Sequence, residues 1–189
     1  GQNGVNYDFG ELLSACVKGF VYIDADNDGA FDPTETGIAG ATVVLLDADG
    51  NPTGRTTVTD DTGRYGFCGL TPGMYQVEEV QPAGYYDGLD SPGSAGGVAV
   101  NPGDRIHSIP LASGARADDY NFGELLPAAI SGRVFADLNG NDALDSGEPR
   151  LGGVTIYLLN ASGARVASTA TDANGKYSFT GLKPGVYGV

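Results

Sequence analysis

Short stretches in which apolar and polar residues alternate run along most of the chain, and clusters of Gly, Pro, Asp and Asn separate them. A period of two is typical of half-buried β-strands, and no stretch keeps helical spacing for three turns. The predicted strands of the best-defined segment are residues 19–23, 41–46, 55–59, 64–68, 74–80, 105–111 and 119–125. Seven strands in about 110 residues predict an all-β sandwich. The longest loop, residues 82–97, has no apolar period and is expected to be exposed.

The chain repeats itself. Tyr7–Leu13 returns as Tyr120–Leu126 with a change only at the second position, and later blocks such as Thr59-Asp60 return as Thr171-Asp172 in the same order. Repeats of this kind predict tandem domains. We interpret residues 1–13 as the closing strand of a preceding repeat, residues 14–126 as one complete repeat, and residues 127–189 as the first part of the next repeat.

The composition of the chain argues against nucleic-acid binding and against a membrane span. The chain carries 24 acidic and 10 basic residues, a net charge of −14, so phosphate would repel it and a nucleic-acid partner is not expected. The longest apolar runs, such as residues 41–46, are too short to span a membrane, and the first residues do not resemble a signal segment. With 41% apolar residues the chain can still build a core.

The segment from Asp24 to Glu35 contains the strongest chemical signal. Oxygen-bearing side chains occupy positions 1, 3, 5, 9 and 12 of a twelve-residue loop, with a glycine at position 6. Calcium takes six to eight oxygens, including a backbone carbonyl from position 7 and both carboxylate oxygens of position 12. The predicted Ca²⁺ ligands are Asp24, Asp26, Asp28, Ala30 (through its carbonyl), Asp32 and Glu35. The alternative is a solvated acidic turn, whose carboxylates would repel one another without a cation.

The equivalent loop of the next repeat departs from this pattern. Its predicted ligands are Asp137, Asn139, Asn141, Ala143 (through its carbonyl), Asp145 and Glu148. Two carboxylates have become amides, and Asp142 replaces the glycine although Asp adopts positive φ less readily. The sequence therefore predicts a weaker second calcium site.

Sequence of strand type lies on both sides of the first loop, whereas an EF-hand sensor needs helices that reorient. The cation is therefore predicted to lock the sandwich and stiffen its junction with the preceding domain. A cation that binds only the folded form contributes about 2.7 kcal/mol at a hundredfold excess over its Kd.

Cys16 and Cys68 are the only two cysteines, and their counterparts in the next repeat are Ala129 and Thr180. They are present together and absent together, as a bonded pair predicts. A disulfide would close a loop of about fifty residues and stabilise the fold by roughly 4 kcal/mol. It would also indicate an oxidising compartment. The alternative is two separately buried small residues.

Other candidate sites carry weaker signals. Asp47, Asp49 and Asn51 could form a further cation site, but an ordinary hairpin turn explains them equally well. An internal bond from Lys18 to the last strand, assisted by Glu79, is disfavoured because Lys18 is predicted to precede the first strand.

The ordered set of motifs resembles the SdrD B-like domain, which comprises the B repeats of serine-aspartate-repeat surface adhesins. The matching residues are the loop from Asp24 to Glu35, Gly37-Ile38-x-Gly40, Thr59-Asp60-x-x-Gly63-x-Tyr65-x-Phe67, Gly69-Leu70-x-Pro72-Gly73-x-Tyr75 and Asn121-Phe122-Gly123. The resemblance implies tandem prealbumin-like Greek-key β-sandwiches, related to collagen-adhesin B-type domains, with an EF-hand-like calcium loop between strands. It also implies a stalk repeat that holds a ligand-binding head away from a cell surface.

The leading functional prediction is a calcium-stiffened, non-catalytic structural repeat of a secreted or cell-surface protein, in an adhesin stalk or fibre. Its expected partners are neighbouring repeats. Head-to-tail self-assembly, with residues 1–13 filling another copy, is a further hypothesis, although truncation of a longer chain is favoured over it. The alternative function is a ligand- or carbohydrate-binding accessory module of a secreted enzyme, for which Tyr85 and Tyr86 would supply an exposed aromatic patch. Catalysis is not expected, because His107 has no nucleophile or orienting group at a workable spacing.

Overall fold

The structure, a computed structural model, describes residues 9–189. Part of the closing strand predicted for residues 1–13 therefore lies outside the described residues, and residues 9–14 form no strand. The chain divides into two compact units, one ending at Leu125 and one covering Leu126–Val189. None of the described residues forms a helix long and apolar enough to cross a bilayer.

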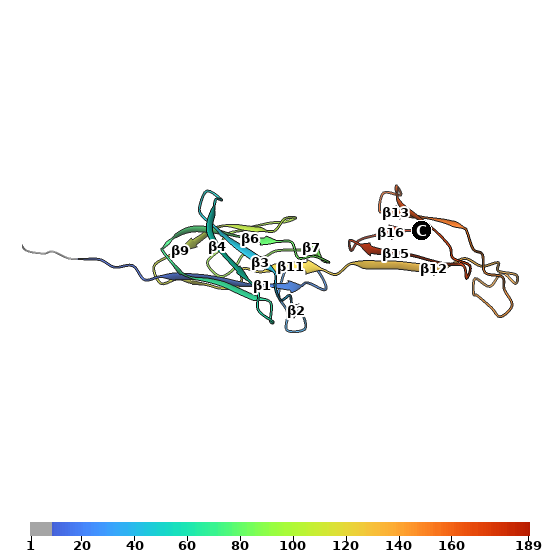
Figure 1. The fold of residues 1–189 in the computed structure, drawn as a ribbon, viewed down its shortest axis with the longest axis horizontal. Helices are drawn as coiled ribbons and strands as arrows, with labels where there is room; N and C mark the ends of the chain where they lie inside the picture. The colour runs from blue at the N-terminus through green and yellow to red at the C-terminus, as the bar shows by residue number, and fades with distance from the viewer. Residues whose placement is uncertain (1–8) are drawn as a thin grey trace, which may run out of the picture. The chain divides into compact units, whose positions relative to one another are not determined.

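Unit 1 is a sandwich of two sheets (Figure 1). In the first sheet β1 (Ala15–Ile23) pairs with β2 (Thr36–Gly37), β5 (Arg64–Leu70), β10 (Arg116–Ala117) and β11 (Phe122–Leu125), and β11 also pairs with β7 (Tyr86–Asp87). The second sheet has the order β4 (Pro52–Val58), β3 (Thr42–Leu46), β6 (Gly73–Val80), β9 (Arg105–Leu111) and β8 (Val98–Val100). Pairing is antiparallel except that β1 runs parallel to β10 and β11.

Alternation along the strands builds the core of unit 1. In β1 the buried Ala15, Val17 and Val21 face the second sheet, and half-buried residues separate them. Phe67, Ile106, Ile109 and Phe122 are buried opposite or beside them, and further core members are Val43, Leu45, Tyr65, Val77 and Tyr120. Each large apolar side chain that is fully buried contributes about 1.5–3 kcal/mol. The predicted sandwich is therefore held by the inward faces of the predicted strands.

Three predicted strands begin three or more residues from their predicted start, among them β4, predicted from residue 55 and observed from Pro52. The first strand begins at Ala15 rather than at residue 19, so Lys18 lies inside β1, on its half-exposed face between the buried Val17 and Gly19. The last strand begins at Phe122 rather than at residue 119 because Asp119 adopts a φ of 68°, which interrupts the extended backbone between β10 and β11.

The expectation of an exposed loop at residues 82–97 was wrong in part: Ala83, Gly84, Pro92, Ser94 and Gly96 are exposed, but the middle of the segment is not. Its short strand β7 pairs with β11, the N–H of Gly88 donates to the carbonyl of Gly123 (2.9 Å), and Asp90 is buried. Tyr85 packs against the core and Tyr86 is half-buried, so these tyrosines do not form an exposed aromatic patch. The backbone of this segment finds hydrogen-bond partners in the sheet, which is why it is not free in solvent.

Unit 2 repeats the first part of this plan. In it β12 (Ala128–Arg133) pairs with β15 (Lys176–Leu182), and β13 (Thr155–Asn160) lies between β14 (Arg165–Ala170) and β16 (Tyr187–Gly188). These pairings match β1 with β5, and β3 with β4 and β6. Leu158 and Phe179 are the buried apolar side chains of this unit.

Candidate metal centre

The first acidic loop connects β1 to β2 and is attached to the end of the first sheet. Asp24 is fully buried, and its N–H donates to the carbonyl of Glu124 in β11 (2.9 Å). Its carboxylate turns into the loop, where Oδ1 accepts from the N–H of Asp28 (3.1 Å) and Oδ2 accepts from the N–H of Gly29 (2.9 Å). Burial raises the pKa of Asp24, and the N–H groups of Gly29 and Asp28 offset part of that rise.

Glu35 closes the loop from its other end. Oε1 accepts from the N–H of Ala25 (2.8 Å), and Oε2 accepts from the N–H of Asp32 (3.0 Å). Asp24, Asp26 and Asp28 each have a carboxylate oxygen within 4.8 Å of the others. A convergent set of oxygen donors fits a hard cation such as calcium and not a metal that prefers sulfur or nitrogen. Asp24, Asp26 and Asp28 therefore fit a hard cation, whereas Asp32 and Glu35 are not part of this group of converging oxygens.

Aromatic side chains fix the loop to β1. The ring of Phe31 lies 4.8 Å, centroid to centroid, from the rings of both Phe20 and Tyr22. Tyr22 is fully buried, and its hydroxyl has no hydrogen-bond partner among the described residues. Burial, followed by the charges of Asp24 and Glu35, raises the pKa of Tyr22. The Tyr22 hydroxyl is therefore a buried polar atom beside these carboxylates that the described residues leave without a hydrogen bond.

The Asn121-Phe122-Gly123 motif has a steric role at this site. A Cβ at Gly123 would lie 2.5 Å from the carbonyl oxygen of Leu89 and 3.1 Å from Oδ2 of Asp24. Only glycine leaves room there for both the carboxylate and the neighbouring backbone.

The second acidic loop has the same backbone arrangement. Asp137 accepts from the N–H groups of Asn141 (3.3 Å) and Asp142 (2.8 Å), and Glu148 accepts from those of Leu138 (2.9 Å) and Asp145 (3.0 Å). The N–H of Ala143 donates to Oδ1 of Asn141 (2.9 Å). Asp142 holds a φ of 60°, where the first loop has Gly29 at 78°.

The interior of the second loop differs in charge. The side-chain amides of Asn139 and Asn141 both donate to Oδ2 of Asp145, each at 2.8 Å. These hydrogen bonds, that of Asn139 first, lower the pKa of Asp145. Asn139 and Asn141 thus supply part of the stabilisation that a cation would give, which is consistent with a weaker site.

The predicted disulfide is present. Cys16 in β1 and Cys68 in β5 face each other across the strand pair, and their sulfur atoms are bonded.

The structure does not support the two weaker candidate sites, the cation site at Asp47, Asp49 and Asn51 and the internal bond from Lys18. Asp47 accepts from the N–H groups of Asp49 (3.0 Å) and Asn51 (2.9 Å), as in a hairpin turn. Lys18 lies on the half-exposed face of β1 in the first sheet, whereas Glu79 is buried in β6 of the second sheet, so the arrangement needed for the internal bond is not present.

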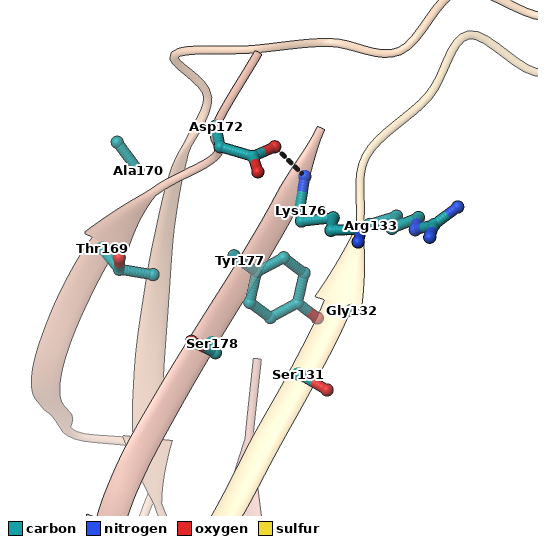
Figure 2. Close-up of a pocket in the computed structure, with 9 residues that line it drawn as sticks. All are labelled: Ser131, Gly132, Arg133, Thr169, Ala170, Asp172, Lys176, Tyr177 and Ser178. Carbon is teal, nitrogen blue, oxygen red and sulfur yellow. Dashed lines mark hydrogen bonds between the residues drawn. The ribbon is translucent and has the colours of Figure 1, made fainter. Parts of the chain in front are cut away.

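A polar groove of about 630 Å³ lies on unit 2 (Figure 2). It is lined by Ser131, Gly132, Arg133, Thr169, Ala170, Asp172, Lys176, Tyr177 and Ser178, and the backbone N–H of Lys176 donates to Asp172 (2.9 Å). Equivalent positions, among them Lys18, Asp60 and Tyr65, line a groove of about 480 Å³ on unit 1. The groove is thus a property of the repeat.

The sequence analysis considered Glu79 only for an internal bond, and it did not predict the burial or half-burial of four carboxylates in unit 1, namely Glu79, Asp90, Asp104 and Glu124. For Glu79 a signal was available, because alternation along 74–80 places it on the same face as the apolar Val77. Asp90 and Asp104 belong to segments without a clear period, whereas Glu124 lies in the last predicted strand, where all four residues of β11 are buried and alternation gives no signal.

Comparison with known proteins agrees with the repeat pattern. A profile of the SdrD B-like domain matches residues 15–123 and again residues 128–189. Serine-aspartate repeat-containing protein C of Staphylococcus aureus (strain Newman) is 34% identical over 197 residues, which cover 99% of this chain and 20% of that protein. The chain therefore spans a fifth of the length of such relatives.

Among solved structures, the Bacillus anthracis TIE protein matches with a TM-score of 0.45 and 18% identity, covering 93% of this chain and 28% of that one. The Streptococcal ancillary pilin matches with a TM-score of 0.45 and 16% identity, covering 93% of this chain and 52% of that one. The predicted all-β fold, with the first part of its plan repeated in a second unit, is confirmed by the strands and sheets described above. With both of its units matched by the profile, the chain belongs to the SdrD B-like domain family.

Proposed function

We propose that the chain is a calcium-stiffened, non-catalytic structural repeat of an extracellular or cell-surface protein. The observation that carries the proposal is the convergence of Asp24, Asp26 and Asp28 at the end of β1, beside a buried hydroxyl without a partner. The disulfide supports an oxidising location, and the family supports a repeat whose partners are neighbouring repeats. Head-to-tail self-assembly stays a prediction.

The position of the loop explains why calcium would stiffen rather than signal. Both flanking elements, β1 and β2, are strands of one sheet, and no helix is present in the described residues to reorient. The hydrogen bond from Asp24 to Glu124 connects the loop to the last residues of β11, and the chain leaves unit 1 just beyond them. An ion that fixes Asp24 therefore also fixes the strand that leads into the next unit.

Calcium is expected to raise the melting temperature of unit 1 by roughly 10 °C at a hundredfold excess over its Kd, measured by calorimetry on the full chain with calcium and with chelator. Asp26→Ala with Asp28→Ala should abolish most of this gain, because both exposed carboxylates leave the ligand set. Asp49→Ala with Asp61→Ala is the matched control, since it removes the same charge from exposed turns. A melting temperature that ignores chelation in the parent chain would rule out stiffening by calcium.

The two loops are expected to differ in affinity. Changing Asn139→Asp, Asn141→Asp and Asp142→Gly gives the second loop the residues of the first at these positions, and should tighten calcium binding there at least tenfold. Isothermal titration of a chain whose first loop carries Asp26→Ala and Asp28→Ala isolates the effect. Two sites of equal affinity in the unaltered chain would contradict the ranking.

A further inference from the structure

The polar groove of unit 1 follows the open side of the sandwich. It is lined from β4 by Thr57 and Val58 and from β5 by residues that include Arg64, Gly66 and Cys68. β4 is the last strand of the second sheet, and β5 pairs only with β1 in the first sheet. Both strands therefore present an edge that no other described strand covers, and we call the groove between them, and its counterpart on unit 2, the edge grooves.

The backbone of β5 directs hydrogen-bonding groups into the groove. The carbonyl of Cys68 accepts from the guanidinium of Arg55 in β4 (2.8 Å), and the carbonyl of Arg64 accepts from the N–H of Asp60 (3.0 Å), so both carbonyls point away from β1. Backbone direction alternates along a strand, and Gly66, halfway between these two residues, faces the same way. An exposed edge of this kind is a template on which an extended segment can pair.

Basic side chains gather at this edge, although the chain as a whole carries a net charge of −14. Unit 1 has only five basic side chains, and three of them, Lys18, Arg55 and Arg64, lie at the groove. The stem of Lys18 lies beside Gly66, where an added Cβ would be 3.0 Å from its Cγ. Lys18 and Arg64 form no ion pair among the described residues. The exposed backbone and the unpaired cations thus coincide.

One carboxylate lies in each edge groove, and its own turn holds it. Asp60 accepts from the N–H groups of Thr62 (2.9 Å) and Arg64 (3.1 Å). In unit 2, Asp172 accepts in the same way from those of Asn174 (2.8 Å) and Lys176 (2.9 Å). Two cations line each groove beside this single carboxylate, so both grooves keep an excess of positive charge.

Unit 2 keeps the charge of its groove with a different set of residues. Ser131 replaces Lys18, yet Arg133 lines the groove beside Lys176, the counterpart of Arg64. Arg133 and Lys176 are cross-strand neighbours (Figure 2), a position in which like charges destabilise a sheet. Neither forms an ion pair with any residue that the structure describes. Two cations that recur through different residues, at a cost to the strand pair, indicate an anionic partner.

The edge and the charge together select the occupant. An unpaired strand edge fits an extended peptide, and the cations fit carboxylates on that peptide. Residues of an added strand alternate between two faces, so carboxylates at every second position would lie on the outer face with Lys18 and Arg64. Two β5 edges from different copies would instead bring like charges together, which disfavours pairing of the chain with itself at this edge.

We propose that the edge grooves bind an extended acidic peptide, which adds a strand to β5 in unit 1 and to β15 in unit 2. The peptide carries carboxylates at alternate positions, and its backbone pairs with the outward N–H and carbonyl groups of Gly66 and of the equivalent Ser178. This docking surface goes beyond the stiffening role, and it includes no residue of the two acidic loops.

Fluorescence anisotropy of a labelled peptide in which Asp alternates with Thr, titrated with the full chain at saturating calcium, tests the proposal. Changing every Asp of the peptide to Asn should weaken binding at least tenfold. The same loss is expected in a groove variant that carries Lys18→Gln, Arg64→Gln, Arg133→Gln and Lys176→Gln. A control variant that removes the same charge from exposed positions elsewhere should bind like the parent chain; it carries Arg116→Gln, Arg150→Gln, Arg165→Gln and Lys183→Gln.

A second peptide separates strand addition from general attraction of charge. N-methylation of its backbone keeps every carboxylate and removes the N–H donors, so binding should again fall at least tenfold. Equal affinity for the two peptides would assign the grooves to polyanions in general and overturn the proposal. It would also be overturned by a parent chain that does not bind the Asp-Thr peptide, or by a groove variant that keeps its affinity, as it would if calcium linked the peptide to the acidic loops.

Discussion

Replacing Cys16 with Ala and Cys68 with Thr is expected to lower the free energy of unfolding of unit 1 by about 4 kcal/mol. The bond closes a loop between residues 52 positions apart, so its loss returns conformational entropy to the unfolded chain. The substitutions copy Ala129 and Thr180, which occupy the equivalent positions of unit 2. The melting temperature should fall by roughly 15–20 °C in calorimetry under oxidising conditions.

Reductant provides the control for this experiment. It should lower the stability of the parent chain by a similar amount and leave the variant unaffected, because the variant has no cysteine. Equal unfolding midpoints for the two oxidised chains would show that the bond does not stabilise unit 1.

Gly19→Ala is expected to destabilise unit 1 by about 3 kcal/mol or more. A Cβ at Gly19 would lie 1.7 Å from the carbonyl oxygen of Tyr120, a backbone atom that also accepts from the hydroxyl of Tyr65 (2.7 Å). Relief requires β1 and the segment before β11 to separate, which breaks the parallel pairing at the centre of the first sheet. Urea unfolding monitored by circular dichroism measures the loss.

Two matched glycines test that reason. At Gly73 in β6 the nearest atom to an added Cβ would be 3.7 Å away on the ring of Tyr75, so Gly73→Ala should be nearly neutral. At Gly132, the counterpart of Gly19 in unit 2, the nearest atoms to an added Cβ would be the hydroxyl (2.5 Å) and ring carbons (2.7 and 2.8 Å) of Tyr177, a half-buried side chain and not backbone (Figure 2). Gly132→Ala should therefore lower the free energy of unfolding much less than Gly19→Ala does. Similar losses at all three positions would contradict the steric account.

The features that could be predicted from the sequence are those that depend on the spacing of residues near one another in the chain. The loop from Asp24 to Glu35 is a single run of residues, and its ligand pattern can be recognised without knowledge of the fold. The pairing of Cys16 with Cys68 was predicted because unit 2 lacks both cysteines. Period-two alternation placed every main strand, since it reports directly which face is buried.

What sequence reasoning missed depends on contacts between distant segments. Glu79, Asp104 and Glu124 come together from β6, the turn before β9 and β11, and nothing in their spacing indicates that these segments meet. The partial burial of residues 85–90 likewise results from pairing of β7 with β11, a two-residue match too short to leave a periodic signal. The start of β1 was placed too late because Cys16 and Lys18 fill its half-exposed face.

The parallel alignment of β1 with β11 has a mechanical consequence. Chain enters unit 1 at the start of β1 and leaves it at the end of β11, and neighbouring strands that run in the same direction place those two points at opposite ends of the sheet. Tension transmitted along the polypeptide therefore loads the hydrogen bonds between these strands in shear. The bonds share the load, because this geometry does not let them break one after another. A unit connected in this way resists pulling from both ends better than its thermodynamic stability alone would suggest.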